Sequence, residues 1–335
     1  MNKKTTLHLL EENIARAVAL LESGKNVAFP TETVYGLGAD ITNASAISRI
    51  FEIKGRPTNH PLIVHIAEID RLDYWANNVP ASAWKLAAHF WPGPLTLILP
   101  KSSHVPLTVT GGQNTVGLRV PDHPIALALL KALGANKALA APSANRFGRL
   151  SPTSANHVQQ ELGDKISMIL DGGICKIGLE STIISFCDSI PLLLRPGGIP
   201  ITAIEEVLNQ KIELNKNLKH ALATPGTHAS HYAPNTRLEV WSTEFIHQRA
   251  LELSAEGLQV ALIIRADSDQ LIHIQNDNIY HILMSANPIE YGQQLYATLR
   301  MLDEKNFSRI LAEAPPDDIP WLAISDRLQR ASFKT

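Results

Sequence analysis

Residues 29–40 read FPTETVYGLGAD, and this stretch decides how the first part of the chain is interpreted. The run VAF at residues 27–29 predicts a strand, which leads into hydroxyl side chains, Glu32 and two glycines. Because strand ends in open α/β sheets expose backbone N–H groups, this is a favourable place for a ligand. It is no dinucleotide fingerprint, since Ile41 occupies the third glycine position, and no phosphate-loop lysine follows. Taken alone, the stretch is more typical of an ordinary turn.

Short apolar runs bounded by proline and glycine continue on both sides of this stretch. They predict strands at VAF, LIVHI, LTLIL, VGLRV, ALAA, MILD, STIISF and PLLL. Apolar residues at helical spacing predict helices over residues 7–21, 44–53, 81–90, 124–133 and 152–162. Several consecutive strands lack a helix between them, so the expected fold class is α/β with a mixed twisted sheet and helices on its faces.

The pattern changes after a helix expected near residues 201–209. A polar stretch with Pro225, Gly226 and Pro234 follows and shows no clear strand, which predicts a linker. Beyond it, strand and helix patterns alternate and predict a smaller α/β domain of the doubly wound, Rossmann-like kind. The expected organisation is a catalytic domain at 1–212, a linker or lid at 213–236 and a C-terminal domain at 237–335.

Composition excludes several classes of protein. The chain has 335 residues, of which 45% are hydrophobic and 19% charged, as in a folded globular protein of about two domains. No apolar run approaches a membrane span, and the N-terminus lacks the apolar core of a signal peptide. A cytoplasmic protein without a membrane partner is therefore expected.

Charge is nearly balanced over the whole chain but not locally. The formal net charge is −2, yet the segment from Pro124 to Gln160 holds four cationic residues and no acidic one. The four are Lys131, Lys137, Arg146 and Arg149. This segment predicts either a face for an anionic partner or an ordinary solvated face.

Cations and small polar side chains gather where strands or helices are expected to end. Lys54 and Arg56 flank a glycine, Arg119 and Arg195 end apolar strands, and APSANRFGRLSPT supplies hydroxyl and amide groups. Such groups suit phosphate oxygens. Motifs of serine hydrolases and zinc proteases are missing, and His228 and His231 lack a third ligand, so no metal bound by protein residues is expected. Phosphoryl or nucleotidyl transfer, in which positioning and charge stabilisation dominate, fits this set.

Seven ordered motifs resemble the YrdC-like threonylcarbamoyl-AMP synthases, and the linker and second domain resemble the long, two-domain form of that family. The motifs are FPTETVYGLGAD, KGRPTNHPLIVHI, FWPGPLTLIL, TVGLRVPDHP, APSANRFGRLSPT, LESTII and LLRPGGI. The resemblance implies a YrdC-like fold and a nucleotidyltransferase that makes L-threonylcarbamoyladenylate from L-threonine, bicarbonate or CO2 and ATP, releasing pyrophosphate. It also implies Mg2+ with ATP, a downstream threonylcarbamoyl transferase complex that modifies tRNA, and a possible tRNA contact.

The same resemblance implies roles for individual residues. Lys54 and Arg56 are implied as catalytic residues. Threonine is expected at Thr33, His65, Arg119, Ala141 and Ser181. ATP is expected at Arg56, His60, Thr115, Ser143, Asn145, Ser151, Arg195 and Tyr232. Two stretches depart from the family pattern: His60 stands where the family usually has Asn, and the linker reads PGTHASHYAP, without the basic first half usual in the family.

Two functions other than the synthase are alternatives. The first is a double-stranded RNA or tRNA-binding module without synthase activity, suggested by the segment from Pro124 to Gln160. The second is a carbamoyltransferase of the hydrogenase-maturation type, which needs cysteine-rich zinc fingers that two cysteines cannot build. A further hypothesis is that residues 224–235, with His231 and Tyr232, close over the nucleotide as a lid.

Overall fold

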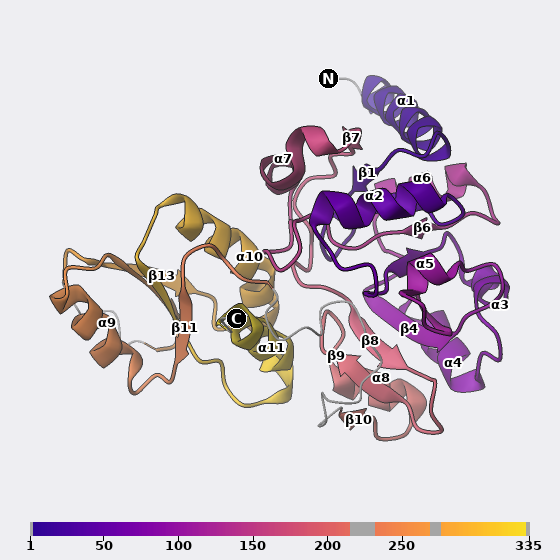
Figure 1. The fold of residues 1–335 in the computed structure, drawn as a ribbon. Coiled ribbons are helices and arrows are strands. Elements are labelled where there is room, and N and C mark those ends of the chain that lie inside the picture. Colours follow the sequence, from indigo (N-terminus) through magenta and orange to yellow (C-terminus); the bar gives the residue numbers. More distant parts are fainter. Residues whose placement is uncertain (1–2, 215–231, 269–275, 333–335) are drawn as a thin grey trace. The chain divides into compact units, whose positions relative to one another are not determined.

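The computed structural model describes residues 3–214, 232–268 and 276–332, which form two compact units (Figure 1). The first unit contains residues 1–147, 151–176 and 180–227. The second contains residues 228–335 together with the short segments 148–150 and 177–179. None of the described helices combines the length and the hydropathy that a membrane span requires.

The first unit is built on a mixed sheet, as expected from its strand-rich sequence. In the described part of the chain ten strands pair in the order β10-β9-β8-β4-β5-β3-β6-β2-β1-β7. Their bounds are β1 (Val27–Phe29), β2 (Gly36–Asp40), β3 (Ile63–His65), β4 (Leu95–Pro100), β5 (Thr115–Arg119), β6 (Leu139–Ala140), β7 (Met168–Ile169), β8 (Thr182–Ser185), β9 (Leu192–Arg195) and β10 (Glu213–Leu214). β3 runs parallel to β5 and β4 parallel to β8, whereas β4 and β5 are antiparallel.

Six of the described helices of the first unit fall where the apolar periodicity predicts them, and the short helices α3 (Leu72–Trp75) and α5 (Leu107–Thr110) were not predicted. The six are α1 (Lys3–Glu22), α2 (Ala44–Lys54), α4 (Ala81–Phe90), α6 (Pro124–Leu133), α7 (Ala155–Leu162) and α8 (Ile201–Leu208). α1 and α6 share an apolar core with β1, in which Leu21, Phe29 and Leu129 are fully buried. A buried side chain of this size contributes about 1.5–3 kcal/mol to folding. This core holds the β1–β2 hairpin that carries the FPTETVYGLGAD stretch.

The two glycines of that stretch lie inside strand β2 and not in the ordinary turn that the stretch by itself suggests. β2 pairs antiparallel with β1, with Gly38 opposite Val27. A Cβ atom at Gly38 would come within 2.9 Å of the Phe29 ring. The glycine is therefore explained by the packing of an aromatic ring against the backbone.

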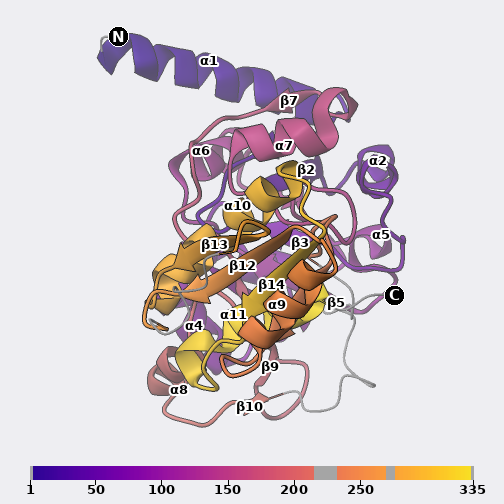
Figure 2. The ribbon, with the colours of Figure 1, turned by 90° about the vertical axis from the view of Figure 1, so that its left-hand side faces the viewer.

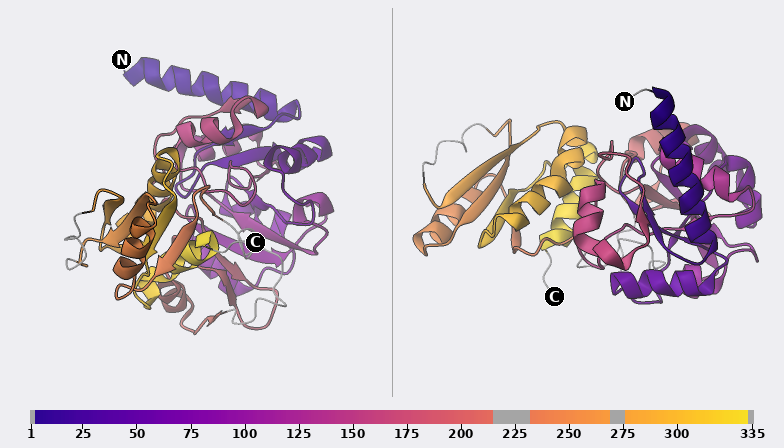
Figure 3. Two further views of the ribbon diagram at one scale, coloured as in Figure 1. Left: turned by 60° about the vertical axis from the view of Figure 1, so that its left-hand side comes forward. Right: turned by 90° about the horizontal axis from the view of Figure 1, so that it is seen from above.

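The second unit is a parallel sheet flanked by helices. The described strands β11 (Leu238–Trp241), β14 (Arg309–Glu313), β12 (Val260–Arg265) and β13 (Ile279–Met284) are neighbours in that order, and all run parallel. α9 (Ile246–Ala255) packs on one face through Ile246 and Leu253 (Figure 2). α10 (Pro288–Glu304) and α11 (Leu322–Ser332) lie on the other side of the strands (Figure 3). This confirms the smaller Rossmann-like domain.

The linker region differs from its prediction at its first residues. Glu213 and Leu214, placed in the linker by their polar surroundings, form strand β10 and pair with Leu192 and Leu193. A strand of two residues is too short to show the alternation of apolar and polar residues that predicts strands. It is recognised only by its pairing with β9. Residues 215–231 lie outside the described residues. They include His228, His231 and most of the segment 224–235 that is expected to form a lid.

Candidate active site

Arg119 is the centre of a buried polar network in the first unit. It is the last residue of β5 and is only 4% exposed. Its Nη2 lies 2.7 Å from Glu32 Oε1 and donates to Thr33 Oγ1 at 2.8 Å, while its Nε donates to the carbonyl of Gly93 at 3.2 Å. Among the described residues Nη1 has no hydrogen-bond partner. One edge of the guanidinium is thus held by the protein, and the remaining nitrogen can bind a ligand oxygen.

The loop between β1 and β2 brings Thr33 and Glu32 to this arginine. Strands β3, β6 and β2 separate β5 from β1 in the sheet, so the loop has to reach past them. The Thr31 hydroxyl stiffens the loop: it accepts the N–H groups of Thr33 and Val34 and donates to the carbonyl of Val34 at 2.6 Å. The loop is buried and internally bonded, which makes it a rigid support.

His65 lies beside Arg119 because β3 and β5 are paired in parallel with these two residues in register. The imidazole is 3% exposed, and its edge packs at 88° against the Phe29 ring. Burial, with the nearby Arg119 charge, lowers the pKa of His65 to about 3. His65 is therefore neutral near pH 7, and its buried Nδ1 has no hydrogen-bond partner in the described structure.

Lys54 and Arg56 flank the end of α2, as their spacing around Gly55 predicts. Gly55 adopts the left-handed conformation with φ 60°, which ends the helix. Lys54 is 3% exposed, and its Nζ donates to the carbonyls of Ser143 and Asn145. Burial, with the neighbouring Arg56 charge, lowers the pKa of Lys54 well below the usual lysine range. Arg56 donates to the carbonyl of Pro61 at 3.0 Å and lies over the Phe147 ring.

The segment after β6 is held against the β1–β2 hairpin. Leu37 donates to the carbonyl of Pro142, and Ala144 donates to that of Tyr35. These bonds fix the segment from Ala141 to Asn145, in which the carbonyls of Ser143 and Asn145 accept hydrogen bonds from Lys54. The structure thus brings Lys54, Ser143 and Asn145 together from segments 89 and 91 residues apart.

Ser181 and Arg195 form a second polar cluster. The guanidinium of Arg195 donates to the Ser181 carbonyl at 2.8 Å and to its hydroxyl at 3.1 Å. The same hydroxyl lies 2.7 Å from Thr96 Oγ1. Ser181 was expected to bind threonine and Arg195 to bind ATP, and their contact links the two sets. Glu180, the residue before Ser181, accepts a hydrogen bond from the fully buried Ser151 hydroxyl, at 2.5 Å from its Oε1.

Three further residues are expected at ATP, and one of them, His60, shares the Phe147 ring with Arg56. Thr115 begins β5 and Arg119 ends it, which separates them by roughly 13 Å along an extended strand. His60 packs edge-on against the Phe147 ring. Tyr232 belongs to the second unit, where it is 1% exposed, has φ 61° and packs near Tyr296 and Arg327. The expected contacts of these residues to ATP stay predictions.

Sequence reasoning missed the buried carboxylates. Glu32 is 2% exposed and pairs with Arg119, and Glu180 receives the Ser151 hydroxyl. Glu32 had a weak signal, because it is the only acidic residue between Phe29 and Ala39 in the motif. Its partner could not be inferred, since Arg119 lies 87 residues further along the chain.

The cationic segment from Pro124 to Gln160 is largely neutralised by carboxylates outside it, of which Glu161 directly follows it and two are distant in sequence. Lys137 pairs with Asp40 at 2.9 Å, Arg146 with Glu161 at 3.2 Å and Arg149 with Asp303 at 3.6 Å. Of the four cations, Lys131 alone has no ion pair to a described residue. The expected positive face is thus weaker than its sequence suggests, because folding brings acids to it.

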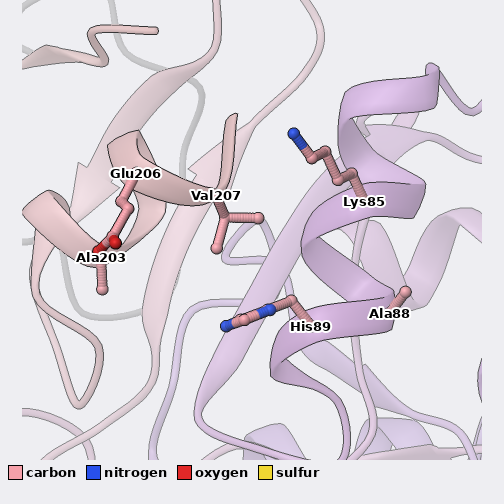
Figure 4. Close-up of a pocket in the computed structure, with 6 residues that line it drawn as sticks. All are labelled: Lys85, Ala88, His89, Ala203, Glu206 and Val207. Atoms are coloured by element: carbon pink, nitrogen blue, oxygen red, sulfur yellow. The ribbon is translucent and has the colours of Figure 1, made fainter. Parts of the chain in front are cut away.

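A hollow of about 510 Å³ lies elsewhere in the first unit, between α4 and α8. Lys85, Ala88 and His89 line it from α4, and Ala203, Glu206 and Val207 from α8 (Figure 4). None of the residues expected at the active site lines this hollow. Within the described ranges, no group of three or more His, Cys, Asp or Glu side chains is placed to hold a metal ion.

Comparison with known proteins assigns both parts of the chain. A family model described as "Telomere recombination" matches residues 19–197, and one described as "Threonylcarbamoyl-AMP synthase, C-terminal domain" matches residues 199–332.

Relatives match over nearly the whole chain. The threonylcarbamoyl-AMP synthase of Pyrococcus abyssi is 41% identical over 96% of this chain and 94% of its own length, and that of Bacillus subtilis is 42% identical over 96% and 93%. The crystal structure of P. abyssi Sua5 with L-threonine is similar with a TM-score of 0.87 at 40% identity, over 96% of this chain and 94% of that one. The chain is thus an enzyme of the threonylcarbamoyl-AMP synthase family, in its long, two-domain form.

Proposed function

We propose that this enzyme makes L-threonylcarbamoyladenylate from L-threonine, bicarbonate or CO2 and ATP, with release of pyrophosphate. In this reaction the threonine amine forms a C–N bond to CO2 and loses a proton, which gives a carbamate. A carbamate oxygen then bonds to the α-phosphorus of ATP, and the bond from that phosphorus to the bridging oxygen breaks. Pyrophosphate leaves with the electron pair of the broken bond.

The observation that carries the proposal is the Arg119 network. A buried guanidinium with one nitrogen left for a ligand, next to a threonine hydroxyl and a neutral histidine, suits the carboxylate and side chain of a small amino acid. The relative solved with L-threonine supports this choice of ligand. Thr33, His65, Ala141 and Ser181 are the further residues that we assign to threonine.

Lys54, Arg56 and Arg195 are assigned to the phosphates of ATP, with Ser143, Asn145 and Ser151 as polar neighbours. In the transition state negative charge builds on the pyrophosphate leaving group, and preorganised cations lower the barrier most there. Because Lys54 is buried among carbonyl oxygens, an arriving phosphate would stabilise its protonated form. Lys54 and Arg56 are therefore proposed as the catalytic cations.

Mg2+ is expected to arrive with ATP. The described residues offer no carboxylate cluster for it, so the phosphates themselves and water would supply its ligands. When bound, the ion would neutralise phosphate charge.

The direct test is pyrophosphate release from ATP with bicarbonate present, with and without L-threonine. Release that depends on threonine is the expected result, and the adenylate product is identified by its mass. Turnover that is independent of threonine would contradict the proposal.

An RNA-binding module without synthase activity is the alternative. It predicts salt-sensitive tRNA binding and no threonine-dependent pyrophosphate release. Membership of the synthase family favours the synthase. In addition, three of the four cations behind the alternative are paired with carboxylates. The proposed setting is the cytoplasm, where a threonylcarbamoyl transferase complex would consume the labile product to modify tRNA.

A further inference from the structure

We propose that Glu32 is a positioning and specificity residue: it orients Arg119 for the amino-acid carboxylate and prevents this arginine from binding inorganic anions. The inference rests on the proposed function, because it assumes that Arg119 receives the carboxylate of threonine.

Geometry gives Glu32 its positioning role. Its Oε1 lies 2.7 Å from Arg119 Nη2, and its Oε2 accepts the backbone N–H of Asp122 at 2.9 Å. The carboxylate is therefore held between β5 and the residues just after it. With Thr33 and Gly93, it occupies the Nε and Nη2 side of the guanidinium. Only Nη1 remains for a ligand, which sets the direction from which a carboxylate can approach.

Charge gives Glu32 its specificity role. Arg119 and Glu32 are 4% and 2% exposed, so water screens their charges poorly. An unpaired buried guanidinium would attract phosphate, pyrophosphate and bicarbonate, all of which the proposed reaction brings near. The Glu32 carboxylate cancels that attraction. A zwitterionic amino acid has no net charge, so Glu32 opposes its binding less than it opposes the binding of an anion.

The Glu32→Gln variant tests both roles at once. It keeps the size of the side chain and an acceptor for Asp122 but removes the charge. Inorganic phosphate is tested as a competitive inhibitor against threonine. The quantity compared between the variant and the wild type is the ratio of the phosphate inhibition constant to the KM for threonine. Loss of one charge-assisted contact corresponds to roughly a tenfold to hundredfold change. We expect this ratio to fall by at least about tenfold, while the KM for ATP stays within about twofold.

A ratio unchanged within about threefold would overturn the inference, and so would an equal rise in the KM for threonine and for ATP. If the wild-type enzyme shows no threonine-dependent pyrophosphate release, the proposed function itself fails. The two failures are thus distinguishable, since the first requires an active wild type.

Two further variants guard against a purely structural effect. Asp40→Asn is the matched control: Asp40 is also buried and paired with a cation, Lys137, in the same unit, and its loss should leave the ratio unchanged. Glu32→Asp keeps the charge but shortens the side chain, and it carries the test if Glu32→Gln does not fold. It should raise the KM for threonine without making phosphate a competitor. Phosphate competition in Glu32→Asp would contradict the role of charge.

Discussion

Arg119 and Lys54 are both buried cations of the same unit, and their surroundings differ. Arg119 faces a full carboxylate charge from Glu32 at 2.7 Å. The Lys54 ammonium faces the carbonyls of Ser143 and Asn145, which carry only partial charges. A buried cation with a carboxylate partner is stable before any ligand arrives, whereas one with carbonyl partners gains more from an incoming anion. This difference agrees with the proposed roles, in which Arg119 binds the amino-acid carboxylate and Lys54 binds a phosphate.

The largest expected effect comes from breaking the ion pair of Arg119. Arg119→Ala leaves the Glu32 carboxylate buried without its cation, which should lower the free energy of unfolding by about 3–5 kcal/mol. Urea unfolding followed by circular dichroism measures this change. The double variant Arg119→Met with Glu32→Leu should recover most of the stability, since apolar residues often replace a buried ion pair at little cost. A single variant that loses less than about 1 kcal/mol would refute the pairing as a stability determinant.

Lys54→Met should affect ligand binding more than stability. The substitution removes a buried charge whose own desolvation is unfavourable, so part of the lost hydrogen bonding is offset. ATP affinity, measured by calorimetry, should fall by about 1.5–3 kcal/mol. Lys85→Met, on α4 and outside the candidate site, serves as the control and should leave ATP affinity unchanged. The distinction between the two cations is lost if Lys54→Met destabilises the fold as much as Arg119→Ala does.

His65 sharpens the comparison because it is a neutral neighbour of Arg119. Its folded pKa of about 3 lies below the unfolded value of about 6.5. The unfolded state therefore binds the proton first, and stability falls as pH decreases from about 6.5 toward 3, by up to about 1.4 kcal/mol per pH unit. Urea unfolding at several pH values should show that the free energy of unfolding decreases less steeply toward acid pH in His65→Asn than in the wild type. Equal slopes would mean that His65 titrates normally.

The smallest effect is expected at the exposed ion pair on the cationic segment. The Lys137 side chain is 41% exposed and pairs with Asp40. Lys137→Ala should change stability by no more than about 1 kcal/mol, because solvent screens such pairs. Transfer RNA binding, measured by filter retention, should change by less than about twofold, since Asp40 already neutralises this charge. A loss of about tenfold or more would show that this segment binds transfer RNA despite the ion pair.

Much of the fold follows from local sequence. Helical periodicity predicts α2, α4 and α6 within a residue or two, and the alternating pattern of the last hundred residues predicts the parallel sheet of the second unit. Lys54 and Arg56 are correctly placed at a helix end because Gly55 marks it within the sequence itself. Strand β10 was not predicted, because two residues are too few to show an alternation of apolar and polar side chains.

The sequence alone determined which residue types stand at the ends of strands and helices, since periodicity, caps and glycine conformation depend on near neighbours. The tertiary structure decided which charges remain uncompensated. Glu32 meets Arg119, and the carbonyl of Ser143 accepts from Lys54. Two cations of the Pro124 to Gln160 segment meet distant carboxylates, Asp40 and Asp303, and a third meets Glu161, which directly follows the segment. These partners are chosen by burial, because a charge removed from water requires a compensating group within a few ångströms, wherever in the chain that group comes from.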